Sequence, residues 1–130
     1  MIAEEHINSL IAEAKQDIGA SEALAAAGYY AHSLFFAHLV LEKLCKALWM
    51  KNKKSIDYPY THNLTRLLKE INATLTNEQV QFYSDMNLFQ AKGRYPDTLH
   101  AIENTITNDT YVTIEVQLKK EIQWLTKQLQ

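Results

Sequence analysis

YAHSLFFAHLVLEKLCKALWMK, residues 30 to 51, is the longest apolar-rich run of the chain. It contains neither glycine nor proline, so no residue within it interrupts a helix. At about 100° per residue, its apolar side chains cover an arc of roughly 180°, which is wider than the stripe of a surface helix. These side chains are Leu34, Phe36, Ala37, Val40, Leu41, Leu44, Cys45, Ala47 and Leu48. We therefore expect this helix at the centre of the fold, in contact with several neighbours.

The opposite arc of this helix mixes charged residues with large apolar ones. Phe35, Leu39 and Trp49 lie on it, and three such groups are unusual on a solvated face. We interpret this arc as an interface or as the rim of a site.

His38, Glu42 and Lys46 form a polar line on that arc, at positions i, i+4 and i+8. Glu42 precedes Lys46 by four residues, which is the favourable order for a helical ion pair. The spacing fits a solvated stripe and a polar group facing a site equally well. The charges of Glu42, Lys43 and Lys46 exclude a transmembrane span, which needs about 20 mostly uncharged residues.

Composition predicts one globular domain over residues 1–130. The chain is 47% hydrophobic and 22% charged, which is ordinary for a soluble protein. Its single cysteine, Cys45, excludes an intramolecular disulfide and is expected to be a small buried side chain. The N-terminal MIAEEHINSL has no basic segment followed by an apolar one, so we expect no signal peptide and a cytoplasmic location.

Charge is unevenly distributed along the chain, although the net charge is only −2. Residues 1–42 carry −5, residues 43–94 carry +5 and residues 95–130 carry −2. A basic middle third is compatible with an anionic ligand. The overall balance is not the strongly basic one that is typical of nucleic-acid-binding domains.

Further helices flank the central one. A helix is predicted from Ala3 to Ala27, with a kink or break near Gly19 left open, and Gly28 ends it. The turn to Tyr30 is so short that the two helices must form an antiparallel hairpin. His62 to Ala73 is expected to be a short amphipathic helix after the loop that contains Pro59.

Two more helices follow. Thr76 to Gln79 has the spacing of a capping box and opens a helix that runs to about Lys92. Asp109 or Thr110 is expected to cap the last helix. Its core stripe consists of Leu118, Ile122, Leu125 and Leu129. The sequence thus predicts an all-α protein, an antiparallel up-and-down four-helix bundle with an additional short helix.

The sequence predicts no metal and no cofactor. A di-iron bundle needs Glu-x-x-His on two helices, and no Glu here is followed three residues later by His. One Cys and five scattered His provide no close pair of zinc ligands. With only three glycines, the chain also has no glycine-rich phosphate-binding loop.

Gly93 to His100, GRYPDTLH, is the candidate catalytic stretch. Arg94 is a permanent cation suited to phosphate oxygens, and His100 is the side-chain type suited to proton transfer near neutral pH. Pro96 interrupts the helix between them, which allows the two side chains to converge. An Arg beside a His suffices to cleave RNA through its own 2′-hydroxyl without a metal. The alternative is that Arg94 and Asp97 only fix a loop and that His100 is a surface residue.

Three segments together resemble the HEPN family, the higher eukaryotes and prokaryotes nucleotide-binding domain. They are EKLCKAL at residues 42–48, THNL at residues 61–64, and GRYPD at residues 93–97. The resemblance covers nearly the whole chain. It implies a bundle of four or five helices that forms a symmetric dimer, and it marks His62 as part of a structural signature.

The resemblance also implies two alternative functions. In the first, Arg94 and His100, separated by five residues, form a toxin-like endoribonuclease site at a homodimer interface, with Glu42 and Lys46 orienting them and Tyr95 and Asp97 in the same binding motif. In the second, the domain cuts nothing and binds a nucleotide, a nucleotidyltransferase or an antitoxin. RNA or a nucleotide is the expected ligand, and no membrane is expected as a partner.

Overall fold

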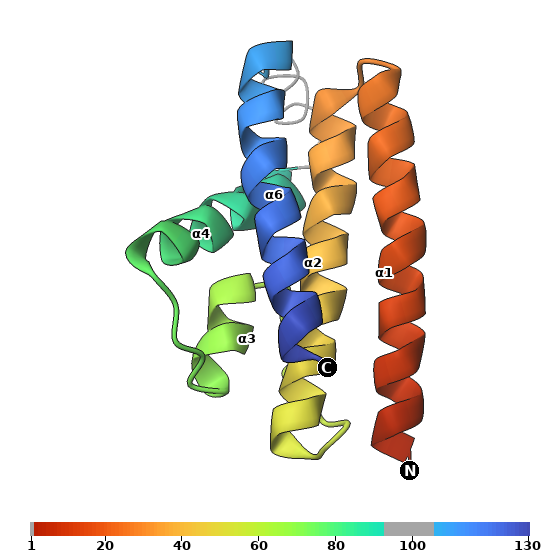
Figure 1. Ribbon diagram of the computed structural model, residues 1–130, viewed down its shortest axis with the longest axis vertical. Coiled ribbons are helices and arrows are strands. Elements are labelled where there is room, and N and C mark those ends of the chain that lie inside the picture. Colours follow the sequence, from red (N-terminus) through yellow and green to blue (C-terminus); the bar gives the residue numbers. More distant parts are fainter. Residues whose placement is uncertain (1, 93–105) are drawn as a thin grey trace.

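The computed structural model describes residues 2–92 and 106–130, and within these ranges it contains five helices and no strand (Figure 1). The helices are α1 (Ile2–Ala26), α2 (Tyr30–Lys53), α3 (Leu64–Glu70), α4 (Asn77–Lys92) and α6 (Asn108–Gln128). The predicted all-α class is confirmed. Nowhere in the described ranges is a helix both long and apolar enough to cross a membrane.

Helix α2 is the centre of the molecule, because α1, α3, α4 and α6 all pack against it. Helix α1 runs antiparallel to α2 along its length, as the short connecting turn predicts (Figure 1). Helix α6 lies beside α2 and runs in the same direction, while α4 lies across the long axis (Figure 1). The predicted up-and-down arrangement therefore applies to the α1–α2 hairpin, whereas α4 lies across the bundle axis instead of along it (Figure 1).

Fourteen of the 24 residues of α2 are buried, including nearly all of the predicted apolar arc. Cys45 is fully buried, as expected, and burial raises the pKa of its thiol. Trp49 is also in the core, with 8% of its surface exposed, so its placement on a partner-facing arc was wrong. Trp49 is buried because α1, α3, α4 and α6 together pack around most of α2. Phe35 and Leu39, in contrast, remain half-buried.

The α1–α2 hairpin forms as predicted, without a break at Gly19. Gly28 ends α1 with a φ of +86°, a conformation that glycine adopts without steric cost. Two buried serines then tie the helices together. Ser21 Oγ donates to the Ser33 carbonyl at 2.8 Å, and Ser33 Oγ donates to the Ser21 carbonyl at 2.7 Å.

The predicted capping box opens α4: the amide of Gln79 donates to Thr76 Oγ1 at 3.1 Å, and the amide of Thr76 donates to Gln79 Oε1 at 3.0 Å. Helix α6 starts earlier than predicted. Thr107 is its N-cap, not Asp109 or Thr110, because Thr107 has extended backbone and its Oγ1 accepts from the amide of Thr110.

Candidate functional site

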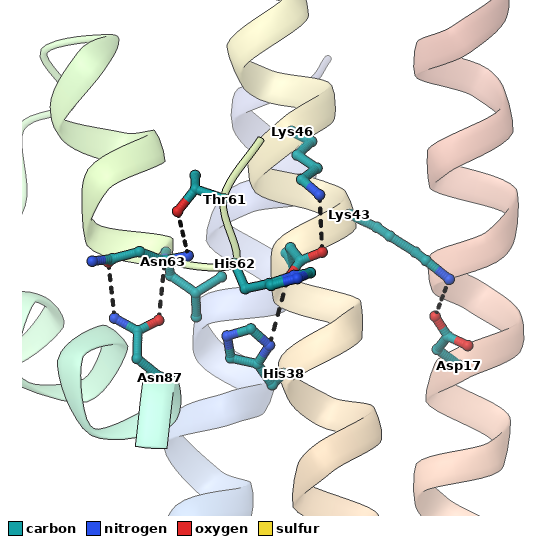
Figure 2. A network of polar contacts seen from close by, with 10 residues as sticks. Asp17, His38, Lys43, Lys46, Thr61, His62, Asn63 and Asn87 are labelled. Carbon is teal, nitrogen blue, oxygen red and sulfur yellow. Dashed lines mark hydrogen bonds and ion pairs between the residues drawn. The ribbon is translucent and has the colours of Figure 1, made fainter. Parts of the chain in front are cut away.

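The predicted site residues divide into two groups. Arg94, Tyr95, Asp97 and His100 lie outside the described residues. Glu42 and Lys46 lie within them, on the middle turns of α2. The described part of the candidate site is therefore the polar cluster that surrounds Glu42, shown in Figure 2.

Glu42 is held by two cationic or proton-donating side chains. Lys46 Nζ donates to its Oε2 at 3.0 Å, and His62 Nδ1 lies 2.8 Å from its Oε1. Because an ionised carboxylate can only accept, His62 Nδ1 is the donor in that contact. Only 6% of Glu42 is exposed, so the polar line on α2 is a buried polar group and not a solvated stripe.

Burial by itself would raise the pKa of Glu42, but its partners outweigh that effect. The hydrogen bonds and positive charge of Lys46 and His62 together hold the pKa of Glu42 below its ordinary value. The carboxylate is consequently ionised at neutral pH. This environment suits a group that orients cationic side chains rather than one that transfers protons.

His38 lies one turn before Glu42 and is fully buried. Its Nδ1 is 3.9 Å from Glu42 Oε1, too far for a hydrogen bond. Burial lowers the pKa of His38, and the charge of Glu42 offsets only part of this effect. The Asn87 side chain and the His62 backbone also favour the charged ring, but burial outweighs them as well. His38 is thus a neutral imidazole beside an ionised carboxylate.

The loop that contains His62 also connects α2 to α4. Asn87 Nδ2 donates to Asn63 Oδ1 at 3.0 Å, and the amide of Leu64 donates to Asn87 Oδ1 at 2.9 Å, as Figure 2 shows. Residues 62–64 are thereby bonded to α2 on one side and to α4 on the other. Helix α4 ends at Lys92, two residues before Arg94. The loop therefore fixes the helix from which the predicted catalytic stretch departs.

Sequence reasoning identified His62 as structural but did not single out Asn87. The available signal was its position: Asn87 follows Tyr83 by four residues, and Tyr83 is fully buried. An amide on a buried helix face needs a hydrogen-bond partner, and the backbone amide of Leu64 at the start of α3, which has no partner within that helix, is one.

The cations on this part of α2 already have carboxylate partners. Lys43 Nζ lies 2.6 Å from Asp17 Oδ2 on α1 and 3.6 Å from Glu13 Oε2. Lys46 is paired with Glu42 and lies over the ring of Tyr58 at 5.1 Å. A phosphate at this face would therefore need a further cation. Within residues 2–92 and 106–130, no group of three or more His, Cys, Asp or Glu could hold a metal ion.

The family model of the HEPN domain matches residues 7–127. No curated protein and no solved structure showed a significant match to the chain. The family match spans nearly the whole chain and includes α2, the 61–64 loop and the stretch from Gly93 to His100. The chain therefore belongs to the HEPN domain family.

Proposed function

We propose that this HEPN-domain protein is a metal-independent endoribonuclease that acts through Arg94 and His100. The observation that carries the proposal is the double link of the 62–64 loop, to Glu42 on α2 and to Asn87 on α4. This link holds the end of α4 against the centre of the fold. It provides a rigid base for an Arg two residues beyond Lys92, and positioning is a large part of catalysis.

The proposed reaction uses the substrate's own nucleophile. The ribose 2′-oxygen attacks the adjacent phosphorus while the bond from phosphorus to the 5′-oxygen breaks. Arg94 binds the non-bridging oxygens as negative charge accumulates on them, and His100 takes part in moving the proton of the 2′-hydroxyl to the departing 5′-oxygen. The products are a 2′,3′-cyclic phosphate and a 5′-hydroxyl, and no metal or water is consumed in this step.

Glu42 and Lys46 act in this proposal as positioning residues, because both are engaged with each other and with the loop. Tyr95 and Asp97 belong to the same stretch as Arg94 and are proposed to shape the phosphate site. We further propose that the protein acts as a homodimer. Two copies of Arg94 would then share one composite anion site, which compensates for the net charge of −2.

The test is incubation of the purified protein with RNA in EDTA, with the product ends analysed for the cyclic phosphate. Wild-type protein is expected to cleave, and both Arg94→Ala and His100→Ala are expected to abolish cleavage. Arg66→Ala and His6→Ala are matched controls, since Arg66 on α3 is paired with Glu70 and His6 is exposed on α1. Both controls are expected to retain full activity.

Two results would reject the proposal. One is that the wild type does not cleave RNA, and the other is that Arg94→Ala and His100→Ala cleave RNA as well as the wild type does. Either result would favour the alternative, a non-catalytic HEPN module that binds a nucleotide or a protein partner. That partner would be a nucleotidyltransferase or an antitoxin, and co-purification with the product of a neighbouring gene would identify it.

A further inference from the structure

A polar hollow lies at the end of the molecule opposite the α1–α2 turn. It has a volume of about 590 Å³ and is formed by the last turns of α2 and α6 and by residues 71–74, which follow α3. The polar part of its lining comprises Lys51, Asn52, Asn72, Thr74 and Gln128, and Trp124 contributes an aromatic ring. We name it the α2–α6 hollow.

Lys51 brings a positive charge into the α2–α6 hollow. Its Nζ donates to the carbonyl oxygens of Gln128 and Gln130, at 3.1 and 2.7 Å. These bonds tie the end of α2 to the end of α6.

Three further lysines lie around the α2–α6 hollow. Lys120 and Lys127 precede and follow Trp124 by four and three residues, so all three share one face of α6. Lys69 stands in the last turn of α3 and lines an adjacent hollow, which shares Ala73 with the α2–α6 hollow. In the part of the chain that the structure describes, none of these three lysines forms an ion pair with a carboxylate.

The neighbouring carboxylates do not cancel this charge at the surface. Glu121 on α6 is only 3% exposed and accepts hydrogen bonds from Gln79, Tyr83 and Gln117. Glu70 on α3 is paired with Arg66. The region contrasts with the middle of α2, where Lys43 and Lys46 are both neutralised by carboxylates.

We propose that the α2–α6 hollow is an exosite for single-stranded RNA, separate from the Glu42 cluster. The lysines contact successive phosphates, a base lies against Trp124, and the amides of Asn52, Asn72 and Gln128 hydrogen-bond its edge. A cationic groove with an aromatic ring is the common way of binding a single strand. Lys120 and Lys127 are seven residues apart, about 10 Å along the helix, so the two lysines can contact different phosphates of one strand. The choice of RNA over another polyanion rests on the proposed function.

The first test measures binding of a labelled 2′-O-methyl oligouridylate strand, which lacks the hydroxyl needed for cleavage. Replacing Lys120→Ala and Lys127→Ala together is expected to weaken binding about tenfold. The dependence of log affinity on log salt should become shallower by about 0.7 for each lysine lost. The double variant Lys15→Ala/Lys119→Ala, which loses the same charge from exposed positions elsewhere, is the control and should bind like the wild type.

The second test uses tryptophan fluorescence. The chain has two tryptophans, and Trp49 is buried in the core, so a change on adding the strand reports Trp124. The strand is expected to quench the wild type and not Trp124→Phe. Quenching by uridine monophosphate with the affinity of the strand would overturn the exosite and show a mononucleotide pocket instead.

Unchanged affinity and salt dependence in the Lys120/Lys127 variant would overturn the exosite, as would no binding by the wild type. These outcomes do not depend on cleavage. A protein that binds the uncleavable strand at Trp124 but leaves ordinary RNA intact would retain the exosite and lose the proposed function. If the protein cleaves RNA but the Lys120/Lys127 variant binds the strand as tightly as the wild type, the proposed function is retained and the exosite is rejected.

Discussion

His38 and Glu42 are one helical turn apart and are driven to opposite charge states. Both are buried, and burial disfavours the charged form of each. Glu42 has Lys46 and His62 as partners, which keep it ionised. For His38, burial outweighs the charge of Glu42 and lowers the pKa, so the ring is neutral at neutral pH. The difference between these neighbours comes from the partners of Glu42, which are Lys46 one turn further along α2 and His62 in the loop before α3.

We predict that His38 makes the protein less stable as the pH falls below 6.5. Because its pKa is lower in the folded state, the unfolded state binds a proton that the folded state does not bind. Above pH 6.5, His38 does not reduce the free energy of unfolding. Below pH 6.5, that free energy falls by up to about 1.4 kcal/mol per pH unit, until the pH reaches the lowered pKa of His38. Urea unfolding of wild type and His38→Gln between pH 5 and 8 measures this slope.

The variant should have a shallower slope than the wild type in that window. His6→Gln, at an exposed position on α1, should keep the wild-type slope. Equal slopes in wild type and His38→Gln would show that His38 is not the group responsible. Glu42 acts in a separate window. Its lowered pKa gives stability that is present above the unfolded value of 4.5 and lost as the pH falls through the folded value.

The candidate site could be predicted from the sequence only where its signals are local. The i, i+4, i+8 spacing identified His38, Glu42 and Lys46 as one line, but not whether the line is buried. Its burial depends on His62, which is twenty residues from Glu42 in the sequence. Asn87 is farther still, and its role depends on where α4 crosses α2. Spacing along one helix contains no information about such contacts.

At the scale of helices, α4 is attached to α6 through one buried carboxylate. Tyr83 on α4 is fully buried, and its hydroxyl donates to Glu121 Oε1 at 3.0 Å. Burial is the main reason that the pKa of Tyr83 is raised, with negative charge nearby adding to it. Gln79 and Gln117 supply the other hydrogen bonds to Glu121. Since none of these partners is a cation, the buried carboxyl group of Glu121 depends on every one of these hydrogen bonds.

Tyr83→Phe is therefore expected to destabilise the protein by about 1–3 kcal/mol, the range for removing one partner of a buried hydrogen-bonding group. The ring still fills the core, so the loss is specific to the hydroxyl. Tyr60→Phe is the matched control, because Tyr60 is 97% exposed, and its stability should equal that of the wild type. Urea unfolding at neutral pH measures both. A loss no larger than that of the control would mean that Gln79 and Gln117 satisfy Glu121 on their own.

Helix boundaries, too, could be predicted from the sequence where their signals are local and not where they depend on distant contacts. The capping box at Thr76 and the glycine at Gly28 act within one turn, and both were predicted correctly. Thr107, Asn108, Asp109 and Thr110 all have side chains that can cap a helix, and local spacing does not rank them. The stacking of Tyr30 on Tyr111 and the bond from Tyr30 to Asn108 fix the start of α6 against α2. These contacts join residues about eighty positions apart, beyond the reach of local patterns.

Across the whole molecule, the two long faces of α2 differ in what covers them. On one face, α1 and α6 leave an apolar groove of about 240 Å³, lined by residues that include Ala37, Val40 and Leu118. On the other face, Phe35 and Leu39 lie half-buried, on the same arc of α2 as Glu42 and Lys46. This second face adjoins the polar cluster. We therefore place the proposed dimer contact there, without Trp49.

Phe35→Glu is expected to convert the dimer into a monomer. A charge at a position that the partner subunit buries has no counter-ion and costs several kcal/mol, about 3–5 for an unpaired buried charge. Light scattering at micromolar concentration should change from twice the chain mass of 15.0 kDa to that mass. Val116→Glu is the matched control, because Val116 is 54% exposed and lies on α6, not on α2. If Val116→Glu dissociates the dimer and Phe35→Glu does not, the contact lies along α6. A wild-type particle of 15.0 kDa would reject the dimer, and with it the composite site of two Arg94 side chains.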